Sequence, residues 1–156
     1  FNIIQHSKIK EYIYLFSYES KNHPFCAPFL ANVLADLDIA LMTAAAGLFV
    51  GTHDFSAYTA KLQPNTQVMR TIESCELVPN NVLSANFFPD KSYALIVNGK
   101  GFMRYQIRMM MGALFQVGKR ELSIDDVKHS LTPNTSMVLT TVAPGSGLLL
   151  NSLNFE

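Results

Sequence analysis

The sequence predicts an α+β domain, in which helices pack on one face of a mixed and mainly antiparallel sheet. Helix-like and strand-like segments do not alternate regularly, no repeats occur, and the candidate strands are too few and too irregularly spaced for a βα barrel. The chain has 156 residues, of which 49% are hydrophobic and 15% charged. This is enough for one compact domain with a sizeable core.

Four segments are predicted as strands, three of them from their aromatic and β-branched residues and the last from its apolar run of leucines. They are residues 11–18, 68–77, 93–97 and 147–155. Residues 19–28 contain two prolines and several polar turn formers, which predicts a loop. Residues 52–64 have no sustained period and are predicted as a loop with a short turn of helix. The turn-rich stretch 80–91 leaves room for one more short strand.

Two further segments are predicted as helices. Residues 30–49 form a long apolar pattern rich in Ala and Leu, and Gly51 follows where helices commonly stop. This pattern predicts a core helix. Ser123, with Asp126 three positions on, predicts a capping box for a short helix that ends near Leu131.

The third predicted helix starts at the turn 98–101, runs to about Val117 and is closed by Gly118. At about 100° per residue, five apolar side chains gather into one stripe. They are Met103, Ile107, Met110, Met111 and Leu114. Arg104 and Arg108, one turn apart, are predicted to lie together on the flank of this stripe, between the core and the fully solvated face.

These two arginines raise the question of their partner, because a guanidinium is always charged and is rarely buried unpaired. On the flank of a helix the stem can pack while the head reaches a cleft, where it binds phosphate or carboxylate bidentately. The spacing equally allows both arginines to pair with a carboxylate elsewhere on the sheet. Residues 91–120 contain six basic and no acidic residues, although the formal net charge of the chain is zero. Ordinary solvated helix ends would explain this local excess as well.

Composition excludes several other classes of protein. Cys26 and Cys75 lie far apart without a CxxC motif, which argues against a disulfide framework and a zinc site and favours a reducing compartment, with the cytoplasm as the expected location. His53 and His129 lack metal-ligand spacing. No apolar run is long enough to span a bilayer. The chain begins without Met or a signal-like segment, and we expect an excised fragment.

Four runs occur in a recognisable order: KEYIY at 10–14, HDFSAY at 53–58, GFMRYQIRMMMGALFQVG at 101–118 and APGSGLLL at 143–150. In this order and spacing they resemble the C-terminal half of the bacterial tRNA pseudouridine synthase A family. The resemblance covers nearly the whole chain and implies that residues 1–156 are the C-terminal domain of such an enzyme. It also implies isomerisation of uridine to pseudouridine in the anticodon stem-loop of tRNA, a homodimer, and chemistry without a metal or other cofactor.

The resemblance assigns roles residue by residue. Tyr12 matches the tyrosine of an R-x-Y-type strand motif that lines the uridine pocket against the base. Lys10 stands where that motif has arginine, so the charge is kept but the bidentate geometry is not. Arg108 matches the arginine of a V-R-x-x-x-G helix that pairs with the catalytic aspartate, and Gly112 matches the glycine of that run.

One catalytic group has no match in this chain. The family's catalytic aspartate lies in a G-R-T-D-x-G-type loop of the N-terminal half, so we expect the isolated chain to be inactive. Asp54 belongs to the HDF run instead and is predicted to cap backbone N–H groups. Five basic residues are candidates for contacts with tRNA phosphates. They are Lys10, Lys100, Arg104, Lys119 and Arg120. Because family members often carry His at positions 104 and 105, no catalytic role is carried over to Arg104 or Tyr105.

Two alternatives from other classes remain open at the level of sequence. The chain could be a non-catalytic RNA-binding module with Tyr12, Tyr14 and Tyr93 as a stacking platform, although no RNP-like aromatic-glycine run supports it. It could also be a dimerisation domain in which the methionines 109–111 pack against a partner.

Overall fold

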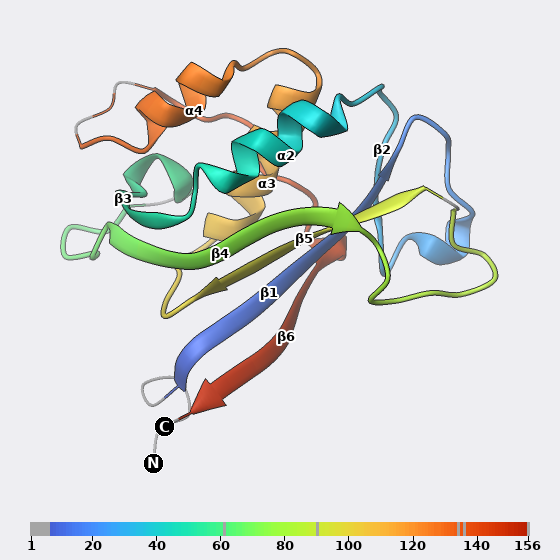
Figure 1. Cartoon of the computed structure of the whole chain (residues 1–156), viewed down its shortest axis with the longest axis horizontal. Coiled ribbons are helices and arrows are strands. Elements are labelled where there is room, and N and C mark those ends of the chain that lie inside the picture. The colour runs from blue at the N-terminus through green and yellow to red at the C-terminus, as the bar shows by residue number, and fades with distance from the viewer. Residues whose placement is uncertain (1–6, 61, 90, 134, 136, 156) are drawn as a thin grey trace.

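The structure, a computed structural model, describes residues 7–60, 62–89, 91–133, 135 and 137–155. Within these residues six strands form one sheet and three α-helices lie on one of its faces, as predicted for an α+β fold (Figure 1). The strands are β1 (Ser7–Tyr18), β2 (Ala31–Val33), β3 (Gly51–Asp54), β4 (Met69–Pro79), β5 (Ser92–Gly99) and β6 (Leu148–Phe155). The helices are α2 (Ile39–Gly47), α3 (Gln106–Gly118) and α4 (Ile124–Ser130), with 3₁₀ turns η1 (Pro24–Cys26), η2 (Ser56–Tyr58) and η3 (Gly145–Gly147).

Strand β1 is the centre of the sheet. Its partner on one side is β5, which pairs antiparallel and continues to β4 and then β3, also antiparallel. Its other side is shared, because β6 pairs antiparallel with residues 7–14 and the short β2 pairs parallel with residues 16–18. Tyr12 therefore lies inside the sheet, opposite Val97 of β5 and Leu150 of β6.

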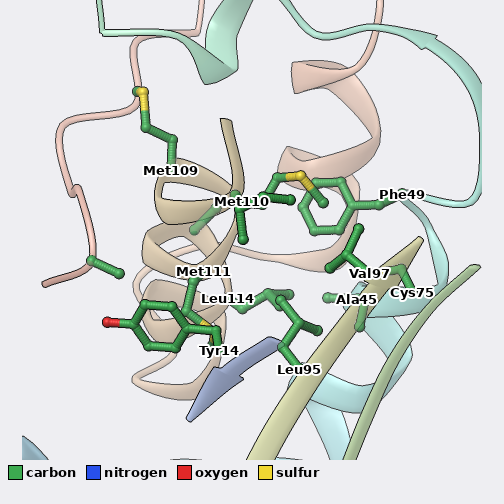
Figure 2. Packing of buried hydrophobic residues seen from close by; sticks show 14 of the residues in the cluster. Tyr14, Ala45, Phe49, Cys75, Leu95, Val97, Met109, Met110, Met111 and Leu114 are labelled. Atoms are coloured by element: carbon green, nitrogen blue, oxygen red, sulfur yellow. The ribbon is translucent and has the colours of Figure 1, made fainter. Parts of the chain in front are cut away.

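The main core fills the space between the sheet and the helices. Tyr14 and Leu95 from the sheet meet Met111 and Leu114 of α3, and Met110 packs beside Phe49 (Figure 2). Eleven of the thirteen α3 residues are buried, all except Arg108 and Gln116. The predicted apolar stripe is confirmed for Ile107, Met110, Met111 and Leu114, whereas Met103 is buried in the turn before the helix. The solvated face opposite to the stripe is absent from α3, because α2 and the chain near Thr141 cover its other sides.

The opposite face of the sheet carries a smaller apolar cluster. Its buried members are Ile13, Leu15, Cys26, Leu30 and Ala94. Two loops cover this cluster at one end of the sheet (Figure 1), and they meet where the Cys26 thiol donates a hydrogen bond to the Phe87 carbonyl at 3.1 Å. No helix in the described ranges has both the length and the apolar character that crossing a bilayer requires.

Several sequence predictions are confirmed. Strands β4, β5 and β6 coincide with three of the four predicted strands within two residues at each end, and β1 begins earlier than predicted. The capping box at α4 is present, because the Ser123 hydroxyl accepts from the Asp126 N–H while the Asp126 carboxylate accepts from the Ser123 N–H. Helix α4 ends at Ser130, one residue before the predicted end.

The prediction of one helix over residues 30–49 was wrong. Its first part is the parallel strand β2, and α2 covers only residues 39–47. The pairing of β2 with the end of β1 is a tertiary contact that overrides the helical propensity of Ala and Leu. Asp38 marks the true start, since its side chain accepts from the Leu41 N–H as an N-cap. This N-cap signal was missed because Asp38 lies within the apolar pattern of residues 30–49.

Of the two glycines predicted to end helices, Gly118 was assigned correctly and Gly51 wrongly. Gly51 does not stop the preceding helix but opens β3, a strand that includes the first three residues of the predicted loop 52–64, and its φ of 107° favours glycine. Gly118 is the last residue of α3, and a Cβ there would lie 2.6 Å from the Met42 sulfur of α2. It serves close helix packing, while Arg120 takes the left-handed position beyond the helix. The described part of 80–91 contains no strand.

Candidate functional site

Arg108 lies in the first turn of α3, at the edge of the core, and is half-buried. Its Nε donates to the Ala143 carbonyl at 2.8 Å, and its own carbonyl accepts from the Ala143 N–H at 3.0 Å. Among the residues that the structure describes, Arg108 forms no salt bridge. The alternative of an internal carboxylate partner on the sheet is therefore wrong for the described chain.

Tyr12 and Arg108 line the same small pocket, of about 250 Å³. Its other walls are the chain from Phe102 to Ile107 and the side chain of Leu148 at the start of β6. Tyr12 is half-buried, and the ring of Phe102 meets it edge-on with the ring centroids 5.3 Å apart. A hollow of about 440 Å³ at the other end of β1 is larger but has no arginine in its walls. The smaller pocket combines a flat aromatic ring with a guanidinium that has no carboxylate partner among the described residues.

The segment 143–147 fixes Arg108 from the other side. The Tyr14 hydroxyl donates to the Pro144 carbonyl, so β1 anchors this segment directly. A Cβ at Gly145 would lie 3.5 Å from the Arg108 guanidinium carbon, and a Cβ at Gly147 would lie 2.5 Å from the Leu15 carbonyl oxygen. The glycines let the segment approach both β1 and the guanidinium. Burial raises the pKa of Tyr14, and the nearby charge of Arg108 partly opposes this shift.

Arg104 does not lie on the helix as predicted, because α3 begins only at Gln106. The buried Gln106 side chain accepts from the Met103 N–H at 2.9 Å and closes the preceding turn. Arg104 is exposed in that turn, and its guanidinium carbon lies 5.1 Å from the ring centroid of Tyr105. The guanidinium carbon of Arg108 lies at the same distance from this ring. The two arginines therefore meet at Tyr105 rather than along a helix face.

The basic residues predicted to contact tRNA divide between the two ends of α3. Lys10 lies two residues before Tyr12 on the same face of β1, and Lys100 and Arg104 lie in the turn before α3. Lys119 and Arg120 follow the other end of the helix, roughly 18 Å from Arg108 at 1.5 Å per residue. Arg120 is already paired there, with its guanidinium 2.7 Å from the Asp38 carboxylate. The five cations do not form one patch.

Arg70 is a further cation near the pocket that sequence reasoning missed. Its Nε donates to the Gln67 carbonyl at 2.7 Å, and a Cβ at Gly101 would lie 3.2 Å from its Nη1. It thus lies beside the turn that carries Arg104. Partial burial lowers its pKa. In the sequence it resembled any charged residue of a strand, and only the pairing of β4 with β5 places it near the pocket.

Asp54 has the capping role predicted for it. Its carboxylate accepts from the Ser56 N–H at 2.9 Å, and its side chain is buried away from the pocket lining. His53 contacts the Val50 carbonyl at 2.8 Å through Nε2. Within the described part of the chain no three His, Cys, Asp or Glu side chains gather in a way that could hold a metal ion.

Both alternative classes lose the surfaces they require. Met109, Met110 and Met111 are at most 5% exposed, so the methionine run offers little surface to a partner. Met110 and Met111 point into the core cluster, whereas Met109 points away from it (Figure 2). Tyr14 is completely buried and cannot stack on a base. The proposed platform therefore loses its central member, while Tyr12 keeps access to the pocket.

Comparison with known proteins agrees with this geometry. A family model described as tRNA pseudouridine synthase matches residues 45–156. A tRNA pseudouridine synthase A of Onion yellows phytoplasma is 31% identical over 151 residues, which are 94% of this chain and 56% of the relative. A tRNA pseudouridine synthase A 2 of Bacillus thuringiensis subsp. konkukian is 28% identical over 155 residues, which are 99% of this chain and 60% of the relative.

A tRNA pseudouridine synthase A of Streptococcus equi subsp. zooepidemicus is 28% identical over 157 residues, covering 100% of this chain and 60% of the relative. The chain thus spans 56 to 60% of the length of these curated relatives. The family model covers the turn before α3, α3 itself and β6, and thus every residue that lines the pocket except Tyr12. The chain belongs to the tRNA pseudouridine synthase family.

Proposed function

We propose that the protein isomerises uridine to pseudouridine in tRNA, in the anticodon stem-loop, and that this chain forms one wall of the uridine pocket. The catalytic aspartate comes from a part of the enzyme outside this chain. One observation carries the proposal: Tyr12 and Arg108 line the same pocket, and Arg108 has no carboxylate partner among the described residues. A permanent charge in that position calls for an anion.

The reaction breaks the C1′–N1 bond, turns the uracil, forms the C1′–C5 bond and releases the C5 proton, while N1 ends protonated. An aspartate must act beside the sugar as nucleophile or base, in its ionised form. The guanidinium of Arg108 favours that form by lowering the pKa of a carboxylate placed beside it. The Ala143 carbonyl already holds Nε, so the remaining donors of Arg108 are free to meet the carboxylate.

Tyr12 is assigned the role of stacking on the uracil ring. Stacking of a base on an aromatic side chain is worth about 1 to 3 kcal/mol, and it compensates for part of the cost of flipping the base out of the tRNA. Phe102 supports the Tyr12 ring edge-on, which keeps one face available to the pocket. The positive N-terminus of α3 adds to the potential that attracts anions there.

The phosphate contacts follow the division between the two ends of α3. Lys10, Lys100 and Arg104 contact the backbone around the flipped nucleotide, whereas Lys119 and Arg120 contact a more distant part of the tRNA. The enzyme acts as a homodimer in the cytoplasm, needs no metal or other cofactor, and keeps its cysteines reduced. The unpaired state of Cys26 and Cys75 supports that location.

Release of tritium from tRNA labelled at C5 of uridine tests the proposal, with the whole protein as its gene encodes it. We expect release by the wild type and none by residues 1–156 alone. Arg108→Ala should lower the rate at saturating tRNA by about 10²- to 10³-fold, as expected for the loss of a preorganised charge partner. Its dissociation constant for tRNA should change less than about threefold, because the substitution removes no contact with a tRNA phosphate.

Arg120→Ala is the matched control with the opposite pattern. It should leave the saturated rate unchanged and weaken binding slightly, with a smaller salt dependence. If Arg108→Ala weakened binding as much as it slowed release, Arg108 would be a phosphate contact. If the wild-type protein released no tritium from any tRNA, the proposed activity would be wrong.

A further inference from the structure

The backbone of Tyr105 is unusual for a residue that precedes a helix. It has φ 64° and ψ 6°, in the left-handed region, and its side chain caps nothing. The residues before α2 and α4, Asp38 and Ser123, are extended and cap their helices. A bulky residue at positive φ is an outlier, and such strain is commonly retained at functional sites. The position of the Tyr105 ring explains why this strained backbone is kept.

The ring of Tyr105 lies at the junction of the two arginines. The guanidinium carbons of Arg104 and Arg108 are each 5.1 Å from its centroid, within the range of a cation–π interaction. The side chain is 37% exposed and lines the pocket together with Tyr12. The left-handed turn thus brings a large aromatic side chain to the pocket wall rather than into the core.

Arg108 is consequently held by three groups that are not carboxylates. Two of them, the Tyr105 ring and the Ala143 carbonyl, contact the guanidinium directly, and the third, Gly145, lies beside it, since a Cβ there would be 3.5 Å from the guanidinium carbon. An arginine side chain has several rotatable bonds, and without such contacts its head would sample many positions at the pocket edge. With them the guanidinium is already oriented before any anion arrives, which lowers the entropic cost of forming a bidentate pair.

We propose that Tyr105 is a positioning residue: its ring holds the Arg108 guanidinium in the orientation that receives the catalytic carboxylate. This inference rests on the proposed function and adds a residue that acts through Arg108. The ring performs the task and the hydroxyl does not. Tyr105→Phe and Tyr105→Asn therefore separate the two, and asparagine tolerates the left-handed backbone well, so both variants should fold.

The test uses the whole protein and two readouts, tritium release from labelled tRNA and the NMR signal of the Arg108 Nε–H group. Tyr105→Asn should lower kcat about tenfold with KM within about twofold of wild type, because misorientation of one catalytic group affects the reacting complex and not tRNA binding. Hydrogen exchange of the Arg108 Nε–H should accelerate in the same variant. Tyr105→Phe should keep at least half of the wild-type kcat and the slow exchange.

The outcomes separate this inference from the proposed function. If the wild type is active and Tyr105→Asn keeps its kcat, Tyr105 does not position Arg108, while the enzyme assignment stands. Equal losses in Tyr105→Phe and Tyr105→Asn would assign the role to the hydroxyl and overturn the inference. If no tRNA is modified by the wild type, the proposed function fails, and exchange of Arg108 Nε–H that is the same in wild type and Tyr105→Asn overturns the positioning role as well.

Discussion

The arginines at the two ends of α3 differ in their partners: the one beyond the C-terminal end pairs with a carboxylate, and the two near the N-terminal end form no salt bridge with the described residues. Beyond the C-terminal end, Arg120 has a φ of 64°, is 72% exposed at its side chain and pairs with Asp38 at 2.7 Å. Before the N-terminal end, Tyr105 has the same φ, and Arg104 and Arg108 gather around its ring. The same residue type and the same backbone conformation therefore occur at both ends in different surroundings.

The helix dipole makes this difference meaningful. Cations are favoured at the C-terminal end of a helix and disfavoured at the N-terminal end, where the first turn of α3 has no acidic residue. The charge of Arg120 is stabilised both by the negative C-terminal end of the helix and by the Asp38 carboxylate. Arg104 and Arg108 add positive charge to an end that is already positive. An anion at the pocket would relieve this unfavourable arrangement, which is what a catalytic carboxylate or a phosphate supplies.

Substitution at Gly145 should disturb the pocket end most strongly. A Cβ there lies at an ordinary 3.5 Å from the Arg108 guanidinium carbon, so Gly145→Ala should remain close to wild type. The branched side chain of Gly145→Val would displace the guanidinium and lower the isomerisation rate by about 10- to 100-fold. Tritium release from labelled tRNA measures this, and equal rates for the alanine and valine variants would show that Arg108 is not held there.

The corresponding glycine at the C-terminal end should affect stability and not catalysis. In Gly118→Ala the new Cβ would lie 2.6 Å from the Met42 sulfur and 3.1 Å from a Leu37 methyl group. Such overpacking lowers the free energy of unfolding by about 1 to 3 kcal/mol. Denaturant unfolding measures the loss, and combining it with Met42→Ala should give less than the sum of the single effects. Strict additivity would contradict the contact.

The sequence predicted the parts of the fold whose cause is local. The capping box at Ser123 and the strand YALIV depend on neighbours along the chain, and both are present. Strand β2 depends on the end of β1 and was mistaken for helix. The start of α3 was missed for a similar reason, because the turn before it is closed by the buried side chain of Gln106.

The candidate site divides in the same way. The family resemblance identified Tyr12 and Arg108, while helical spacing alone left the partner of Arg104 and Arg108 undecided. Their shared pocket arises from β1, the turn before α3 and the start of β6, which no local pattern brings together. Tyr105 could not be found because a left-handed tyrosine has no sequence signature. Asparagine or glycine at that position would have been a signal.

Asp38→Asn tests the ion pair at the C-terminal end of α3, and its expected effect is smaller. The asparagine oxygen can still accept from the Leu41 N–H as the N-cap of α2, so only the ion pair with Arg120 is lost. The free energy of unfolding should fall by less than about 1 kcal/mol, as for other exposed pairs. Affinity for tRNA should rise up to about threefold at low salt if Arg120 contacts phosphate. Filter binding at two salt concentrations measures this, and an unchanged affinity would remove Arg120 from the tRNA contacts.

The smallest expected effect concerns the ionisation of Tyr105 at the pocket end. A hydrogen bond from Arg104, with its Nη2 3.5 Å from the phenol oxygen, and the charges of Arg104 and Arg108 lower the pKa of Tyr105. Burial raises the pKa of Tyr14 and raises that of Tyr58 to about 12. In an absorbance titration at alkaline pH, Tyr105 should therefore ionise before these two, and Tyr105→Phe should remove that early phase.

Arg104→Gln should move this phase to higher pH, because the first cause of the lowered pKa is lost, and Lys100→Gln is the matched loss of a neighbouring cation. If both variants shifted the ionisation of Tyr105 equally, the lowered pKa would result from the general positive charge nearby and not from the contact between Arg104 and the Tyr105 hydroxyl. Removing Arg104 should also stabilise the free chain by about 0.3 to 0.5 kcal/mol, since it takes a cation away from the positive end of α3. A loss of stability instead would show that the positive charge of Arg104 does not destabilise the N-terminal end of α3 in the absence of a bound anion.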